Sequence, residues 1–172
     1  MNTILAILQA GRARVLRLLA LFALLLVGPP AVAETAFSPM LTLRHGDRVI
    51  ELEREQLEAL PQHRLQTSTT LSEEKTVWEG PLARDVLALL DLPAGAVPIR
   101  MTSWDDYRVD LTSEDFHRWD VILALRANGQ PMSVLELGPL RVIYPRDQHE
   151  ELRDQRFDHR WVWMLNEIIV EP

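Results

Sequence analysis

The stretch that decides the fold lies in the last third of the chain. It consists of two segments separated by five residues: Ala127-Asn128-Gly129-Gln130-Pro131-Met132 and Gly138-Pro139-Leu140-Arg141-Val142-Ile143-Tyr144-Pro145. Asn-Gly is the strongest short-range signal for a two-residue β-hairpin turn, because both central positions of that turn need a positive φ. Residues 141–144, of which the last three are apolar, predict a strand. The stretch therefore predicts a hairpin followed by a core strand.

Short strand and helix patterns alternate over the rest of the chain. Extended segments are predicted at residues 40–43, 49–52, 64–70, 75–79, 98–102, 107–111, 121–125 and 161–170. Short helices are predicted at residues 53–60, at 82–90 after an opening Pro81, and from a cap at Thr112 or Ser113 to near Trp119. Residues 148–157 are helical or irregular. These patterns predict an α+β fold that is mostly β, with short helices between hairpins.

The first 33 residues have the pattern of a secretory signal peptide. Arg12, Arg14 and Arg17 precede an apolar stretch at residues 18–27, and Ala31-Val32-Ala33 supplies the small residues of a cleavage site. The apolar stretch is about half of the roughly 20 residues that span a membrane. We therefore expect export by the general secretory route to the periplasm, cleavage after Ala33, and no membrane insertion afterwards. A retained N-terminal anchor is the alternative.

Cleavage would leave residues 34–172 as a single domain of acidic character. The signal contains three of the 18 basic residues and none of the 25 acidic ones, so 15 basic residues remain and the formal charge is −10. Such a charge repels nucleic acid and anionic lipid. The chain has no cysteine, which excludes disulfides, thiolate nucleophiles and thiolate metal ligands.

Five short motifs follow one another along the chain. They are Gly80-Pro81-Leu82, Asp105-Asp106-Tyr107, the Asn128-Gly129 hairpin, the Gly138-Pro139-Leu140-Arg141 strand ending in Pro145, and Trp161 or Trp163. In this order they resemble the molybdopterin-binding domain of sulfite-oxidase-type oxidoreductases, over residues 40–171. The resemblance implies the sulfite-oxidase-type fold and a cofactor cleft.

Other residues depart from the pattern of catalytic members. The resemblance places Thr67 where those enzymes have the cysteine that ligates molybdenum, and a hydroxyl is a poor substitute for a soft thiolate. Arg146 and Asp147 follow Pro145 where the family has glycines that approach the cofactor phosphate, and Asp106 stands where it often has glycine. The signal also lacks the adjacent arginine pair that exports folded, cofactor-loaded proteins. We therefore expect no cofactor.

The predicted ligand cleft combines the residues that match the family's cofactor site with nearby aromatic and basic side chains. It consists of Thr67, Trp104, Asp106, Tyr107, Arg141 and Arg146. Each has a structural alternative. Arg141 could pair with Glu136 or Asp147, residues 67–70 could serve only as strand formers, and the tryptophans other than Trp104 could be core. His149 and His159 match no metal-ligand spacing, so neither a metal site nor a catalytic residue is predicted.

Three functions of different classes remain open. The favoured one is an exported, non-catalytic ligand-binding module with a sensory or accessory role, which reuses the cofactor cleft for a small anion or contacts a membrane signalling protein. The second is an active molybdopterin-dependent oxidoreductase with an unusual metal ligand. The third is a structural or interaction protein of the cell envelope.

Overall fold

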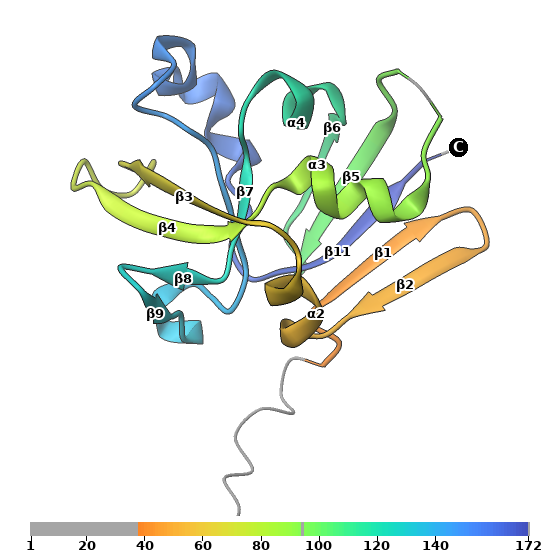
Figure 1. Cartoon of the computed structure of the whole chain (residues 1–172). Helices are drawn as coiled ribbons and strands as arrows, with labels where there is room; N and C mark the ends of the chain where they lie inside the picture. Colours follow the sequence, from red (N-terminus) through yellow and green to blue (C-terminus); the bar gives the residue numbers. More distant parts are fainter. Residues whose placement is uncertain (1–37, 94, 172) are drawn as a thin grey trace, which may run out of the picture. The chain divides into compact units, whose positions relative to one another are not determined.

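Strands dominate the part of the chain described by the computed structural model, residues 38–93 and 95–171 (Figure 1). The strands are β1 (Leu41–His45), β2 (Arg48–Leu52), β3 (Gln62–Thr67), β4 (Thr76–Pro81), β5 (Pro98–Ser103), β6 (Arg108–Thr112), β7 (Ile122–Ala124), β8 (Arg126–Ala127), β9 (Gln130–Pro131), β10 (Arg141–Ile143) and β11 (Leu165–Val170). The predicted mostly-β, α+β class is confirmed. The predicted signal peptide at residues 1–33 lies outside the described residues.

The helices are short. The α-helices are α2 (Arg54–Ala59), α3 (Ala83–Leu87) and α4 (Glu114–Arg118), and the 3-10 helices are η2 (Ala88–Leu90), η3 (Val134–Glu136), η4 (Glu150–Arg153) and η5 (Gln155–Arg160). None in the described part of the chain is long and apolar enough to cross a membrane.

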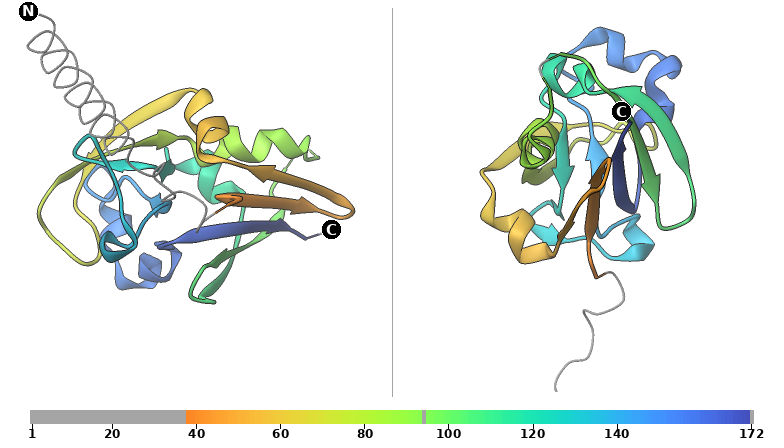
Figure 2. Two further views of the ribbon diagram at one scale, coloured as in Figure 1. Left: turned by 90° about the horizontal axis from the view of Figure 1, so that it is seen from below. Right: turned by 90° about the vertical axis from the view of Figure 1, so that its right-hand side faces the viewer.

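The five-stranded sheet joins the two ends of the domain. Its order is β2-β1-β11-β5-β6, and only the β1–β11 pair is parallel. Thr42 stands opposite Glu167 in that pair, and side chains at alternate positions such as Leu43 and Ile168 are buried. Both views in Figure 2 show β1 and β11 side by side. The last strand therefore completes a sheet begun by the first.

The predicted Asn-Gly hairpin is confirmed in a second, four-stranded sheet. Its order is β3-β4-β8-β9, and Asn128 and Gly129 connect β8 to β9 with φ of 50° and 78°. The carbonyl of Val77 accepts a hydrogen bond from the Asn128 N–H at 2.7 Å, and the Asn128 side chain accepts one from the Val77 N–H at 3.0 Å. The turn is thus fastened to β4.

A third, two-stranded sheet of β7 and β10 lies in the core. Figure 1 shows β7 between β3 and β4 on one side and the five-stranded sheet on the other. Gly80 of β4 approaches β7 so closely that an added Cβ would be 2.0 Å from the Leu123 carbonyl oxygen. Gly138 has the same role before β10, where a Cβ would be 2.5 Å from that of Met132. Both Gly-Pro-Leu motifs therefore mark places where backbone packs against its neighbour.

Helix α3 and its extension η2 are fixed to the five-stranded sheet. Arg48 of β2 donates to the Leu89 carbonyl at 2.8 Å and pairs with Asp91 at 2.8 Å. The buried side chains of Val86 and Leu90 join the core, as the predicted apolar face requires.

Several predicted boundaries are wrong. Pro81 ends β4 opposite Gln62, and α3 begins only at Ala83. Ser113 precedes α4, but its hydroxyl accepts the Val97 N–H at 3.1 Å instead of capping the helix. The last strand starts at Leu165 and not at residue 161, because Met164 has a left-handed φ of 50° that interrupts the extended run. Residues 148–157 contain the 3-10 turns η4 and part of η5.

Candidate functional site

The six predicted cleft residues occupy two regions of the domain. Thr67 ends β3, Arg141 begins β10, and Arg146 follows that strand. The other three, Trp104, Asp106 and Tyr107, belong to the turn between β5 and β6. A cavity of about 210 Å³ is lined by Tyr107 but not by Thr67, Arg141 or Arg146. We therefore describe a basic region at β3 and β10 and an aromatic region at the β5–β6 turn.

Arg141 is buried without a counter-ion. Its side chain is 6% exposed, and its guanidinium lies over the Trp78 ring, 4.7 Å from the centroid. Within the described residues it forms no hydrogen bond or ion pair, and its buried Nε has no acceptor. Burial alone lowers the pKa of the Arg141 guanidinium from its ordinary value to about 10. The group is therefore a desolvated cation that only an aromatic ring stabilises.

The alternative partners of Arg141 are engaged elsewhere. Glu136 accepts hydrogen bonds from the backbone N–H and the hydroxyl of Ser133, at 2.9 and 2.7 Å. Asp147 pairs with Arg153 at 2.9 Å and lies 3.5 Å from the Lys75 ammonium. The predicted alternative of an Arg141 pair with Glu136 or Asp147 is therefore wrong.

Asp147 forms hydrogen bonds with the residues at the end of β3. Its carboxylate accepts the Ser68 N–H at 3.0 Å and the Ser68 hydroxyl at 2.9 Å, and its own N–H donates to the Thr67 hydroxyl at 3.1 Å. Thr67 and Ser68 are 0% and 1% exposed. Burial raises the pKa of the Asp147 carboxyl, but the Ser68 hydrogen bonds and the charges of Lys75 and Arg153 outweigh it, so the pKa is lowered. The contact explains why β3 ends at Thr67 and not at residue 70.

Arg146 is neutralised by its neighbours. One nitrogen donates to the Ser68 hydroxyl at 3.0 Å and pairs with Glu73 at 3.0 Å, although its buried Nε lacks an acceptor in the described residues. Of the two arginines predicted for the cleft, Arg141 alone is without an acidic partner in the described part of the chain.

The aromatic region lies on the surface at the β5–β6 turn. Trp104 is 39% and Tyr107 42% exposed, and Asp106 has a left-handed φ of 64°. The Tyr107 hydroxyl donates to the His159 carbonyl at 2.7 Å, which connects the turn to η5. Burial raises the pKa of Tyr107. Tyr107 lines the 210 Å³ cavity together with Asp105, Asp158, Trp161 and Trp163.

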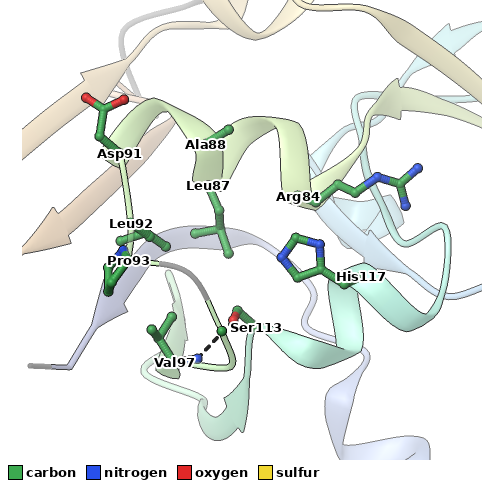
Figure 3. Close-up of a pocket in the computed structure, with 10 residues that line it drawn as sticks. Arg84, Leu87, Ala88, Asp91, Leu92, Pro93, Val97, Ser113 and His117 are labelled. Carbon is green, nitrogen blue, oxygen red and sulfur yellow. Dashed lines mark hydrogen bonds between the residues drawn. The ribbon is translucent and has the colours of Figure 1, made fainter.

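A larger cavity, of about 350 Å³, lies between α3, η2 and the start of α4 (Figure 3). Figure 3 shows Arg84 and His117 at one end and Asp91 at the other. Arg84 pairs with Asp120 at 2.6 Å, and Asp91 pairs with Arg48. Arg84 and Asp91 therefore already have counter-ions, and neither side chain requires the charge of a ligand.

Comparison with known proteins identifies the family that the sequence motifs resemble. The profile of the oxidoreductase molybdopterin binding domain matches residues 44–148. A solved structure with a similar fold is that of the sulfane dehydrogenase SoxCD from Paracoccus pantotrophus, with a TM-score of 0.57 and 15% identity over 76% of this chain and 37% of that one. No curated protein matches significantly.

The arrangement of the sheets is thus that of a sulfite-oxidase-type molybdopterin-binding fold. The chain belongs to the oxidoreductase molybdopterin-binding domain family. It spans well under half of the SoxCD chain that it matches, 37% of its length.

The residue at the position where catalytic members of the family have their metal ligand does not fit molybdenum. Thr67 is fully buried, and its hydroxyl already accepts the Asp147 N–H. An aliphatic hydroxyl does not ionise as a thiol does, and molybdenum would have to displace this contact. No redox step can therefore be assigned to this site.

The tryptophans show what sequence patterns can and cannot reveal. Trp78, Trp119 and Trp161 are buried, as predicted for core residues, whereas Trp163, for which the same was predicted, is only partly buried. The stacking of Trp78 on Arg141 joins β4 to β10, and no local pattern relates these two positions. The carboxylates of Asp105 and Asp158 were likewise not predicted as site residues, because the cavity joins a turn to η5.

Proposed function

We propose that this protein is a non-catalytic, ligand-binding member of its family that holds a small oxyanion or carboxylate at Arg141. The observation that carries the proposal is the burial of the Arg141 guanidinium with no counter-ion in the described residues. Buried charges in proteins are ordinarily paired, since desolvation of an ion costs several kcal/mol. A bound anion would supply the missing charge.

The chemistry of Arg141 selects the class of ligand. A guanidinium presents its N–H donors in a planar fork that matches two oxygens of a carboxylate, sulfate or phosphate. Stacking on Trp78 leaves the edge of the fork as the direction for hydrogen bonds. The low dielectric around a 6% exposed side chain strengthens such bonds relative to those at the surface.

The Thr67–Asp147 contact supports a function without molybdenum. At the end of β3 the Thr67 hydroxyl accepts the Asp147 N–H, and the Asp147 carboxylate accepts from the Ser68 hydroxyl. Export to the periplasm and a sensory or accessory role beside a membrane signalling protein belong to the same proposal. The oxidoreductase and the envelope-protein alternatives make different predictions for metal content and for anion binding.

Thermal unfolding of the intact chain tests the proposal. Sulfate, phosphate, sulfite and formate are added at constant ionic strength, with chloride as reference. A ligand at one hundred times its Kd stabilises the folded state by about 2.7 kcal/mol. We expect a saturable rise in Tm for at least one anion, which is lost in Arg141→Met and kept in Arg126→Met, whose arginine pairs with Glu58 at 2.7 Å.

Two results would overturn this function. One molybdenum atom per chain in protein purified from its native host would favour the oxidoreductase. Equal responses of the wild type and Arg141→Met to every anion would leave the envelope-protein alternative as the better explanation.

A further inference from the structure

We propose that the cavity at the β5–β6 turn is a second binding site, and that it takes a small alkylated ammonium ion. This site is independent of the anion site at Arg141, because none of its lining residues takes part in the contacts of that arginine. The cavity has a volume of about 210 Å³, below the usual range of about 300–1,000 Å³ for drug-sized ligands. It therefore suits a ligand of a few heavy atoms.

Aromatic rings form most of the wall. Tyr107 comes from the β5–β6 turn, and Trp161 and Trp163 come from the segment before β11. The electron-rich face of an aromatic ring attracts a cation, and rings on several sides act together. Trp161 is only 4% exposed, so its ring is largely removed from water, where the attraction between a ring face and a cation is strongest.

Two carboxylates complete the lining. Asp105 accepts hydrogen bonds from the Ser103 hydroxyl and the Tyr107 N–H but forms no ion pair in the described residues. The Asp158 carboxylate has neither a hydrogen bond nor an ion pair there. The lining thus carries negative charge that the protein itself leaves uncompensated.

The basic side chains of this part of the chain are directed elsewhere. Arg108 lies 3.9 Å from the Asp106 carboxylate, and Arg160 pairs with Asp115. The Arg160 guanidinium also lies over the Phe157 ring, 4.4 Å from its centroid. An external cation is therefore the group that the cavity lacks.

The apolar lining decides which cation fits. A metal ion or ammonium would lose strong hydration and regain few ligands, since the described residues form no cluster of three metal-binding side chains. A tetraalkylated nitrogen spreads its charge over its methyl groups, so it is weakly hydrated and also buries apolar surface against the rings. An anion would meet two carboxylates. The combination of rings and carboxylates thus points to a quaternary or otherwise alkylated ammonium group.

Titration of the intact chain with tetramethylammonium chloride tests the proposal. Tryptophan fluorescence reports binding, because two of the three rings are indoles, and sodium chloride at equal ionic strength is the reference. Asp158→Asn removes one carboxylate without breaking a contact, so its Tm should equal that of the wild type while its Kd rises about fivefold or more. Tyr107→Leu removes a ring without a change of charge and should also weaken binding.

The control variant is Asp120→Asn, which makes the same change in net charge at a residue that pairs with Arg84 away from this cavity. Its Kd should equal that of the wild type. Saturable binding weakened in Asp158→Asn and Tyr107→Leu but not in Asp120→Asn supports the site. The proposal is overturned if tetramethylammonium gives no saturable response, if neutral tert-butanol binds as tightly, or if all three variants bind like the wild type.

Discussion

Replacement of Arg141 by methionine is expected to stabilise the ligand-free protein. Burial lowers the pKa of Arg141 from its ordinary value to about 10, which corresponds to about 3 kcal/mol of destabilisation at neutral pH. Methionine has a similar length and no charge. The substitution also removes the stacking of the guanidinium on Trp78, which stabilises the protein by about 1 kcal/mol. The net expectation is a gain of about 2 kcal/mol, or roughly 6–8 °C in Tm for a domain of this size.

Urea unfolding followed by circular dichroism measures this difference. The midpoint should rise while the slope with urea stays constant, because the surface exposed on unfolding hardly changes. Arg126→Met is the matched control, since the same substitution there removes an ion pair with Glu58 and should destabilise by about 1 kcal/mol or less. A pH series gives a second check. The penalty on charged Arg141 is complete below the folded pKa of about 10 and is lost as the pH rises above that value, toward the ordinary pKa of arginine, so the advantage of Arg141→Met should shrink there.

The reasoning would be refuted if Arg141→Met destabilised the protein as much as Arg126→Met does, or more. That result would mean that the Arg141 charge is compensated in the ligand-free protein. The inference of a missing anion would then lose its basis.

Three other substitutions test the structure around the site. Gly80→Ala places a Cβ 2.0 Å from the Leu123 carbonyl and should cost about 3 kcal/mol or more in urea unfolding, whereas Gly129→Ala has open space and should cost only about 1–2 kcal/mol through its positive φ; equal losses would contradict the close contact. Asp147→Asn should destabilise by about 1–2 kcal/mol at pH 7, and because the pKa of this carboxyl is lowered, the difference should vanish as the pH falls below 3.8; a difference independent of pH would refute its ionic basis. Trp78→Leu should cost about 2–4 kcal/mol and weaken anion binding, and unchanged anion affinity would show that the ring does not orient the guanidinium.

The elements that could be predicted from the sequence depend on local chemistry. Asn128 and Gly129 adopt the positive φ angles that their types favour, so the hairpin followed from two residues. The start of α3 could not be found in this way, because Pro81 suits both a first helical turn and the end of a strand. The parallel pairing of β1 with β11 joins residues more than 120 positions apart, such as Thr42 and Glu167, and local patterns carry no information about it.

In the candidate site, too, local sequence determines some features and the fold determines others. The resemblance selected Thr67 and Arg141, and the structure places both against Trp78, whose indole N–H donates to the Thr67 carbonyl at 3.4 Å. The sequence could not show that Arg141 lacks a partner, since acidic residues are plentiful and only the fold decides which of them it reaches. For the same reason, sequence motifs do not predict the cavity that Asp158 and Tyr107 both line.

The most direct test of the central claim is an NMR titration of the Arg141 guanidinium. The Nε–H signal of Arg141 is assigned by its absence from the spectrum of Arg141→Met, and the intact wild-type chain is titrated with sulfate at constant ionic strength. If Arg141 holds an anion, this signal shifts and saturates, while the signals of exposed arginines such as Arg156 move little. A fixed Arg141 signal across the titration, with sulfate and with each of the other anions, would contradict the claim.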